Sequence, residues 1–106
     1  MDVGISSYDG YIPKLRLSRA AIADANSWMN PALRAQSKGT RAMASWDEDS
    51  LTMAVEAGRR VIQGPGADII DGFYLASTTL PYEDRLNAGI AAGAISLKAE
   101  VQAFDI

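Results

Sequence analysis

Two strand-like segments with a helix between them limit what this chain of 106 residues can fold into. Residues 67–78 (ADIIDGFYLAST) contain the run FYLA, which is apolar on both faces, as in an interior strand. Residues 100–106 (EVQAFDI) alternate apolar and polar residues, as in a half-buried strand. Residues 84–97 between them (DRLNAGIAAGAISL) are typical of a helix rich in small residues. Because strands separated by a helical crossover pair in parallel, these segments predict an α/β layer fold.

Two further helices are predicted before this unit. Residues 15–29 (LRLSRAAIADANSWM) place apolar residues at helical spacing after Ser18, a good N-cap, so we expect a helix of about three turns. The clearest helix is predicted in residues 47–64 (DEDSLTMAVEAGRRVIQG). Its acids lie at the positive end, and Arg59 and Arg60 lie near the negative end.

The remaining segments are less helical. Residues 3–13 (VGISSYDGYIP) are typical of a short strand that bends at Gly10 and stops at its final proline. Residues 30–46 are irregular, and the Asn-Pro pair and Gly39 within them mark a loop. The predicted order is therefore β-α-α-β-α-β in a mostly parallel sheet. No linker divides the chain, so we expect residues 1–106 to form one domain or less.

Composition excludes several classes of function. The chain has no cysteine and no histidine, so disulfides, thiolate chemistry, Cys/His zinc sites and histidine base catalysis cannot arise within it. A formal net charge of −3 without a basic stripe argues against nucleic acid as a partner. No apolar run approaches the ~20 residues that span a bilayer, and the N-terminus lacks the pattern of a secretory signal. We therefore expect a cytoplasmic protein, in keeping with the absence of cysteine.

Three motifs have a structural and a functional interpretation. The acids Asp47–Asp49 could form a metal or acid/base cluster, but their position at a helix start favours capping. Residues 64–66 (GPG) lack the spacing of a phosphate-binding loop and favour a helix-to-strand turn. Gly89 and Gly93, with Ala88 and Ala92, put small residues on one helix face and favour close packing of that helix on a sheet or on another helix. We predict no metal site.

Loop residues 77–81 (STTLP) are the best candidates for a ligand site. They follow a predicted parallel strand, where open α/β sheets place their ligands; the alternative is a polar turn. Arg41, next to Gly39, could meet a phosphate group, or it could be a solvated surface residue. Trp28 and Trp46 lie near helix ends and are predicted to pack rather than to stack on bases.

Several stretches together resemble a known superfamily. Residues 3–19 (VGISSYDGYIPKLRLSR), residues 46–59 (WDEDSLTMAVEAGR) and the segments STTLP and EVQAFDI resemble, in order and spacing, the N-terminal part of thiolase-superfamily condensing enzymes. The resemblance is closest to the hydroxymethylglutaryl-CoA synthase-like branch, with beta-ketoacyl-acyl-carrier-protein synthase III more distant. It implies an α/β, thiolase-like fold in which residues 1–106 are a single partial domain, the opening of the first half.

The resemblance also implies what chemistry the longer enzyme performs. In the family, the strand similar to VQAFDI leads within a few residues to a nucleophilic cysteine at a helix N-terminus. That cysteine takes an acyl group from a CoA or carrier-protein thioester, and a backbone amide and a histidine form the oxyanion hole. We therefore expect the nucleophile after Ile106, no catalytic residue within the chain, and no activity of the chain alone.

Individual residues are carried over from the family where they match. The general acid/base glutamate of hydroxymethylglutaryl-CoA synthases falls near Thr78, which cannot shuttle a proton as a carboxylate does, and Glu83 is out of register. The specific hydroxymethylglutaryl reaction is therefore less favoured, and a thiolase-like or other ketoacyl-forming condensation is at least as well supported. The region 37–41 lies where synthase III relatives contact CoA, which makes Gly39 and Arg41 the candidate CoA-binding residues.

Partners follow from the same resemblance. Acyl-CoA or an acyl-carrier thioester is the expected substrate, with no covalently bound cofactor. A homodimer and a small zinc-containing OB-fold partner protein are expected as well. Two alternatives remain open: a non-catalytic α/β binding or assembly module that uses an exposed sheet edge, and an acyl-CoA-binding protein without chemistry.

Overall fold

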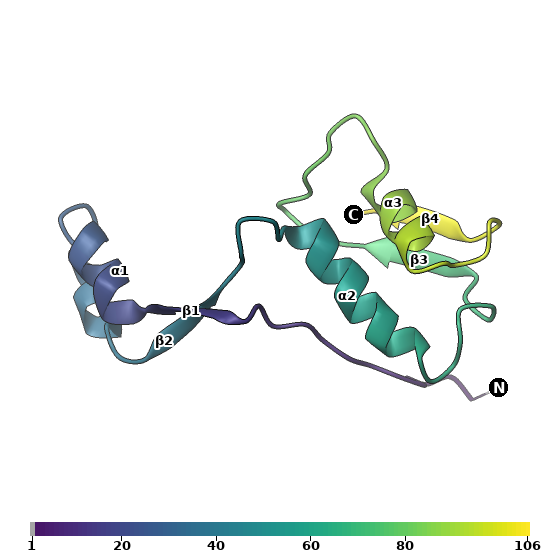
Figure 1. Ribbon diagram of the computed structural model, residues 1–106, viewed down its shortest axis with the longest axis horizontal. Coiled ribbons are helices and arrows are strands. Elements are labelled where there is room, and N and C mark those ends of the chain that lie inside the picture. The colour runs from purple at the N-terminus through teal and green to yellow at the C-terminus, as the bar shows by residue number, and fades with distance from the viewer. Residues whose placement is uncertain (1) are drawn as a thin grey trace. The chain divides into compact units, whose positions relative to one another are not determined.

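The computed structural model describes residues 2–106, and Figure 1 shows the course of the chain. The chain divides into two compact units. The larger comprises the segment up to Tyr11 together with Glu48–Ile106, and the smaller comprises Ile12–Asp47. The expectation that both belong to one partial domain stays a prediction.

The smaller unit contains a two-stranded antiparallel sheet and two short helices. Strand β1 (Leu15–Ser18) pairs with β2 (Thr40–Met43), and helix α1 (Arg19–Asn26) and the 3₁₀ helix η1 (Pro31–Gln36) lie between them in sequence. Ser18 caps α1, since its hydroxyl accepts from the Ala21 N–H at 3.4 Å, which confirms the predicted start. The helix has 8 residues, about two turns and not three.

Residues 30–46 are more ordered than the sequence predicts. Asn30 caps η1 and a proline occupies its first turn, so the Asn-Pro pair begins a helical turn and not a plain loop. Strand β2 was missed because its short segment, TRAM, is exposed throughout and has no apolar face of its own. Its pairing with β1 depends on residues about 25 positions away, which no local pattern reveals.

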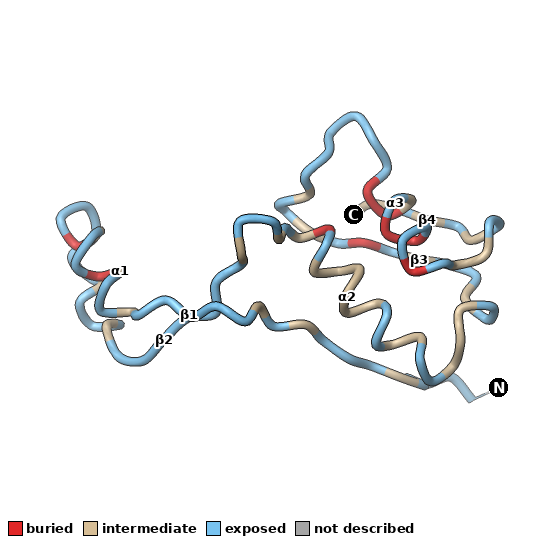
Figure 2. Tube along the Cα trace, in the orientation of Figure 1, coloured by how far each residue is buried: buried red, intermediate tan, exposed pale blue. Residues whose placement is uncertain are grey.

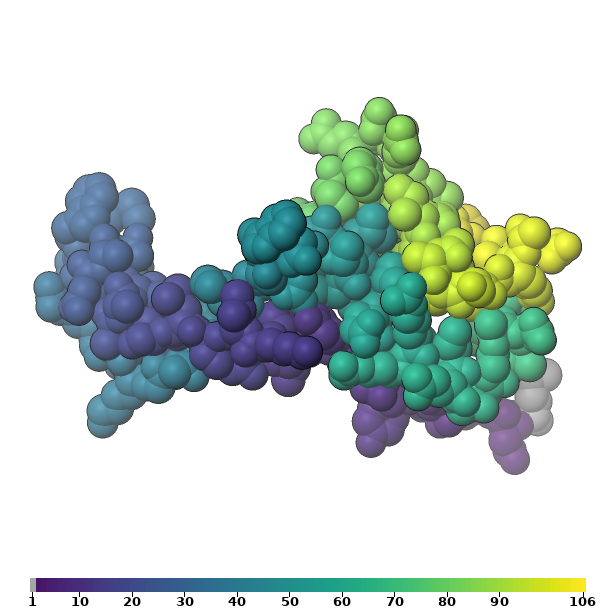
Figure 3. All heavy atoms as spheres, in the orientation of Figure 1, coloured from purple at the N-terminus to yellow at the C-terminus, as the bar shows by residue number. Residues whose placement is uncertain are grey.

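The predicted strand at residues 3–13 is absent from the described chain. The part of this segment within the larger unit runs extended along helix α2 (Ser50–Ile62), as Figures 1 and 3 show. Side chains tie it there: the Ser7 hydroxyl donates to the Val61 carbonyl at 3.2 Å, and the Arg60 guanidinium donates to the Gly10 carbonyl at 2.8 Å. A strand requires a backbone partner, and these bonds join side chain to backbone.

The larger unit contains the predicted β-α-β arrangement. Strand β3 (Gly72–Leu75) pairs in parallel with β4 (Gln102–Asp105), in a register that sets Gly72 opposite Gln102 and Leu75 opposite Asp105. Helix α3 (Asn87–Ala94) lies between them in sequence and packs on both strands and on α2. The parallel pairing and the α/β class are confirmed.

A small core joins α2, α3 and the sheet. Leu51, Leu75, Ala88 and Ala91 form its buried cluster. Figure 2 shows buried stretches, in red, on α2, β3 and α3. Alanines, and not the two glycines of α3, supply the close packing: a side chain at Gly93 would meet open space, and one at Gly89 would meet Leu86 of the neighbouring turn. Gly58 of α2 is the tight position, because an added Cβ would lie 3.2 Å from the Ile95 Cδ1 atom. The predicted close packing of α3 is therefore confirmed, with Ala88 and Ala92 buried, but Gly89 and Gly93 do not supply it.

Only one face of the parallel sheet is covered within the described residues. Phe73 and Leu75 point toward the helices, while Tyr74 on the other face is 65% exposed. Tyr74 stacks on Phe104 of β4, with ring centroids 5.2 Å apart. The sequence therefore identifies FYLA correctly as a strand, but one of its two apolar faces is open.

Helix α2 begins with a complete capping box. The Asp49 carboxylate accepts from the Thr52 N–H at 2.8 Å, and the Thr52 hydroxyl accepts from the Asp49 N–H at 2.9 Å. Arg59 and Arg60 occupy the last turn, as predicted. The capping interpretation of the acids is thus confirmed for Asp49.

Replacing Asp49 by alanine should lower the free energy of unfolding by about 1 kcal/mol, because it leaves an N-terminal amide of α2 without an acceptor. Asp49→Asn should lose much less, since the amide oxygen still caps. Urea unfolding followed by circular dichroism measures both. Asp47→Ala removes the same charge two residues away and is the matched control. An equal loss in Asp47→Ala and Asp49→Ala would contradict the capping account.

Candidate functional site

The carboxyl ends of β3 and β4 bring two predicted site segments together. The Ile106 N–H donates to the Leu75 carbonyl at 2.8 Å, and the Ser77 N–H donates to the Ile106 carbonyl at 3.3 Å. The loop that contains Thr78 therefore begins beside the end of β4. This is the edge of a parallel sheet at which open α/β folds bind ligands, as the sequence predicts.

Hydroxyl groups shape the loop at this edge. The Ser77 hydroxyl lies 3.2 Å from that of Thr79 and accepts from the Thr79 N–H at 3.1 Å. The Ser50 hydroxyl at the start of α2 donates to the Thr79 carbonyl at 2.6 Å. Ser77 and Thr79 thus hold the turn, and Thr78 between them is exposed. The loop presents one outward hydroxyl and no carboxylate at this position.

Asp105 connects the same edge to helix α3. Its carboxylate accepts from the Asn87 N–H at 2.9 Å, from the Asn87 side-chain amide at 3.0 Å and from the Ala88 N–H at 2.6 Å. The Asn87 side-chain bond, helped by the Ala88 and Asn87 backbone bonds and partly opposed by desolvation, holds the pKa of the Asp105 carboxyl below its ordinary value. Asp105 was not identified from the sequence, because no local pattern shows that a strand residue caps a distant helix.

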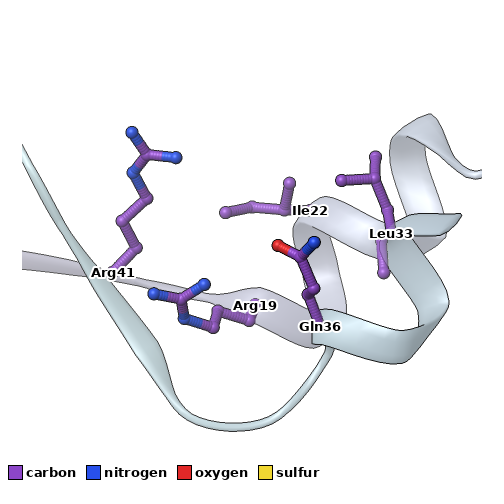
Figure 4. Close-up of a pocket in the computed structure, with 6 residues that line it drawn as sticks. Arg19, Ile22, Leu33, Gln36 and Arg41 are labelled. Atoms are coloured by element: carbon purple, nitrogen blue, oxygen red, sulfur yellow. The ribbon is translucent and has the colours of Figure 1, made fainter. Parts of the chain in front are cut away.

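A second candidate site lies within the smaller unit. Its cavity, of about 50 Å³, is lined by residues of α1, η1 and β2: Arg19, Ile22, Ala23, Leu33, Gln36 and Arg41. Figure 4 shows both guanidinium groups on the same side of Ile22, with Leu33 on the other side. Two arginines without an acid among the lining residues favour an anion. The volume suits one small group such as a phosphate and excludes a whole nucleotide.

Only one of the two CoA-binding residues predicted from the sequence lines this pocket. Arg41 lines it, whereas Gly39 does not. Gly39 adopts a positive φ of 79°, which favours glycine, and its carbonyl accepts from the Arg19 N–H at 3.0 Å. Gly39 therefore shapes the turn that brings Arg19 and Arg41 together. Arg19 was missed, although its place just after the Ser18 cap puts it in the first turn of a predicted helix.

The other sequence candidates have structural roles or none. Within residues 2–106, no group of three or more acids, histidines or cysteines could hold a metal ion. Residues 64–66 form the predicted turn after α2, with the Gly66 N–H donating to the Ile62 carbonyl at 2.8 Å. Trp28 is 82% exposed and Trp46 is 96% exposed, so their predicted packing roles are wrong for the described chain. None of the helices described here is both long and apolar enough to cross a membrane.

Comparison with known proteins identifies the relatives of this chain. No protein-family model matches it. Hydroxymethylglutaryl-CoA synthase from Methanococcus vannielii is 35% identical over 111 residues, and that from Methanocella arvoryzae is 32% identical over 111 residues; each match covers 99% of this chain and 31% of the relative. A crystal structure of 3-oxoacyl-(acyl-carrier-protein) synthase III superposes with a TM-score of 0.78 at 21% identity, over 96% of this chain and 32% of that one.

Nearly the whole chain is thus similar in sequence to about a third of hydroxymethylglutaryl-CoA synthase, and it has a thiolase-like fold. It spans about a third of the length of the curated hydroxymethylglutaryl-CoA synthases that it matches. The solved synthase III shares the fold at low sequence identity, which confirms the thiolase-like prediction.

The lowered pKa of the Asp105 carboxyl predicts a specific acid sensitivity of the folded chain. Because its folded pKa lies below the unfolded value, its stabilising contribution is present above about pH 4 and is lost as pH falls through the lowered folded pKa. Asp105→Asn should therefore be less stable at neutral pH and should lose less stability on acidification than the wild type. Urea midpoints measured from neutral to acid pH test this.

The matched control is Asp68→Asn, which changes an exposed carboxylate of the same unit that takes no part in the Asn87–Asp105 contacts. It should keep the acid dependence of the wild type. An Asp105→Asn variant with an unchanged acid slope would show that the carboxylate is not held by these three donors.

Proposed function

We propose that this chain is part of an enzyme that condenses acyl thioesters. The observation that carries the proposal is the match of nearly the whole chain to hydroxymethylglutaryl-CoA synthases at 32–35% identity. The meeting of the Ser77–Thr79 loop with Ile106 at one sheet edge supports it, because ligands of α/β folds bind at such edges. Acyl-CoA or an acyl-carrier thioester is the proposed substrate.

The reacting group of this enzyme is a cysteine in the residues that follow Ile106 in the longer protein. Its thiolate attacks the thioester carbonyl carbon, the bond from that carbon to the CoA sulfur breaks, and CoA leaves as the thiolate and takes up a proton. The acyl group then resides on the cysteine and is available to a carbanion partner. The described residues contribute position and substrate contacts, and the chain alone performs no transfer.

Thr78 favours a ketoacyl-forming condensation over the hydroxymethylglutaryl reaction. A threonine hydroxyl cannot exchange protons as a carboxylate does. The neighbouring hydroxyls, Ser77 and Thr79, are engaged in holding the turn. Glu83, the acid considered from the sequence, is exposed in the loop that precedes α3. We therefore infer that the loop supplies polar contacts without a general acid.

The pocket of the smaller unit is the proposed contact for a phosphate group of CoA. Arg19 and Arg41 provide charge and donors, and Ile22 and Leu33 provide an apolar wall. A guanidinium suits phosphate because its donors match two oxygens at once. The cavity accepts one phosphate, so the rest of the nucleotide would lie outside it.

A second function is favoured by the open sheet face. The described sheet of the larger unit has two strands, and Tyr74 and Phe104 are 65% and 44% exposed on its uncovered face. Such a surface supports a non-catalytic binding or assembly module. The expected homodimer, the small zinc-containing OB-fold partner and the cytoplasmic location belong to the first proposal and await their own measurements.

The two functions are separated by one labelling experiment. The full-length gene product, incubated with radiolabelled acetyl-CoA and then denatured, should retain the acyl group on a cysteine located after residue 106. Intact-mass analysis and peptide mapping identify the residue. Prior alkylation of the thiol should abolish labelling. Absence of covalent label, or a gene product without such a cysteine, would reject the condensing enzyme and leave the assembly module.

Replacing either pocket arginine should weaken the use of CoA substrates. Arg19→Ala and Arg41→Ala should each raise KM for acetyl-CoA by about tenfold, the effect of losing a charge-assisted hydrogen bond of ~1.5 kcal/mol. Steady-state kinetics with acetyl-CoA and with acetyl-pantetheine, which lacks the nucleotide, measure the effect.

The matched control is Arg34→Ala, which removes an exposed arginine of η1 that does not line the pocket. KM for acetyl-pantetheine should be unchanged in all three variants. If Arg34→Ala raises KM for acetyl-CoA as much as Arg41→Ala does, the pocket is not the phosphate contact.

A further inference from the structure

Helix α3 takes its N-terminal cap from another element. Leu86 occupies its N-cap position and makes no side-chain capping bond. The Asp105 carboxylate, at the end of β4, instead accepts from the N–H groups of Asn87 and Ala88. These amides otherwise lack partners within the helix, and the positive end of the helix favours a negative charge. The cap therefore joins the first turn of α3 to the last residue of β4.

Asn87 extends this junction to the loop before α3. Its side chain is 1% exposed, accepts from the Tyr82 N–H at 3.2 Å, and donates to the Tyr82 carbonyl at 2.8 Å and to the Arg85 carbonyl at 3.3 Å. The same amide group donates to Asp105 at 3.0 Å. One buried asparagine thus fastens the loop, the helix and the strand end to each other.

The end of β4 is consequently fixed from two sides. On one side, β3 binds it through the Ile106 N–H and the Leu75 carbonyl. On the other side, α3 binds it through Asp105. The end of β4 therefore has a defined place and direction. Free rotation of this segment would carry an entropic cost for any group that must be held in a reacting geometry.

We propose that Asp105 is a positioning residue for acyl transfer: by capping α3, it fixes where the chain leaves β4 and hence where the reacting sulfur lies. This inference rests on the proposed function. The Asp105 carboxylate bonds to Asn87 and Ala88, so the role assigned to it is indirect. Its role is separate from that of the Arg19–Arg41 pocket, so it predicts a loss in kcat and not in KM for the thioester.

A carboxylate suits this role better than an amide. Both of its oxygens accept, and the three donors that face it are all N–H groups. An asparagine at this position would turn an NH₂ group toward one of those donors or lose one of the bonds. The positive end of α3 also favours the negative charge of Asp105.

The experiment compares Asp105→Asn, Asp105→Glu and the control Asp68→Asn in the full-length protein. For each, kcat and KM are measured with acetyl-CoA, together with the pH dependence of cysteine alkylation by iodoacetamide. We expect kcat to fall between about tenfold and a hundredfold in Asp105→Asn, as for a small displacement of a reacting group. KM and the kinetics of Asp68→Asn should match the wild type.

Asp105→Glu keeps the charge and the acceptor oxygens but lengthens the side chain by one methylene, so it should retain the fold and still reduce kcat. If Asp105→Asn does not fold, the kcat of Asp105→Glu tests the inference instead. A folded Asp105→Asn or Asp105→Glu protein with wild-type kcat and an unchanged alkylation profile overturns this inference but leaves the proposed function standing. A wild-type protein that accepts no acyl group overturns the proposed function, and this inference with it.

Discussion

The parallel pairing of β3 with β4 decides where the chemistry-bearing segments of the larger unit can lie. It places the carboxyl ends of both strands at one edge, so that Ser77 and Ile106 share a backbone hydrogen bond although they are far apart in sequence. The pairing in turn requires a crossover, and α3 supplies it. Because the crossover begins at Asn87, its first turn also meets the end of β4, where Asp105 caps it. The parallel register of β3 and β4 thus fixes the positions of the loop that begins at Ser77, the start of α3 and the end of β4.

The hydrophobic core cannot account for this order by itself. Seven apolar residues of the described chain are buried, and four of them are alanines: Ala23, Ala88, Ala91 and Ala92. An alanine buries one methyl group, worth about 0.8 kcal/mol, so such a core contributes little. Small side chains do let α3 approach the sheet closely, which shortens the distance between its first amides and Asp105. The polar junction at Asn87 therefore carries a larger share of the structural specificity than a polar group usually does.

Sequence reasoning succeeded where the signal was local. The caps at Ser18 and Asp49 and the β-α-β unit at residues 72–105 follow from propensity, periodicity and capping residues a few positions apart. It failed where a partner was distant. Strand β2 exists only because β1 lies beside it, and residues 3–13 lack a strand partner within the described chain. The candidate site shows the same division: the sequence suggests Arg41 and the loop at Thr78, whose roles stay predictions, whereas Arg19 and Asp105 become candidates only through tertiary contacts.

Arg19 and Asp105, which the sequence did not suggest, share one physical property that explains their absence from any motif. Asp105 acts through a carboxylate that caps a helix beginning 18 positions earlier, and Arg19 acts with Arg41 through a turn held by the Gly39 carbonyl. In both cases the useful group is supplied by one element and its orientation by another. A chain without cysteine or histidine has little reactive chemistry to reveal in its composition. What distinguishes it is the placement of polar and charged groups, and placement is decided by contacts that only the folded structure contains.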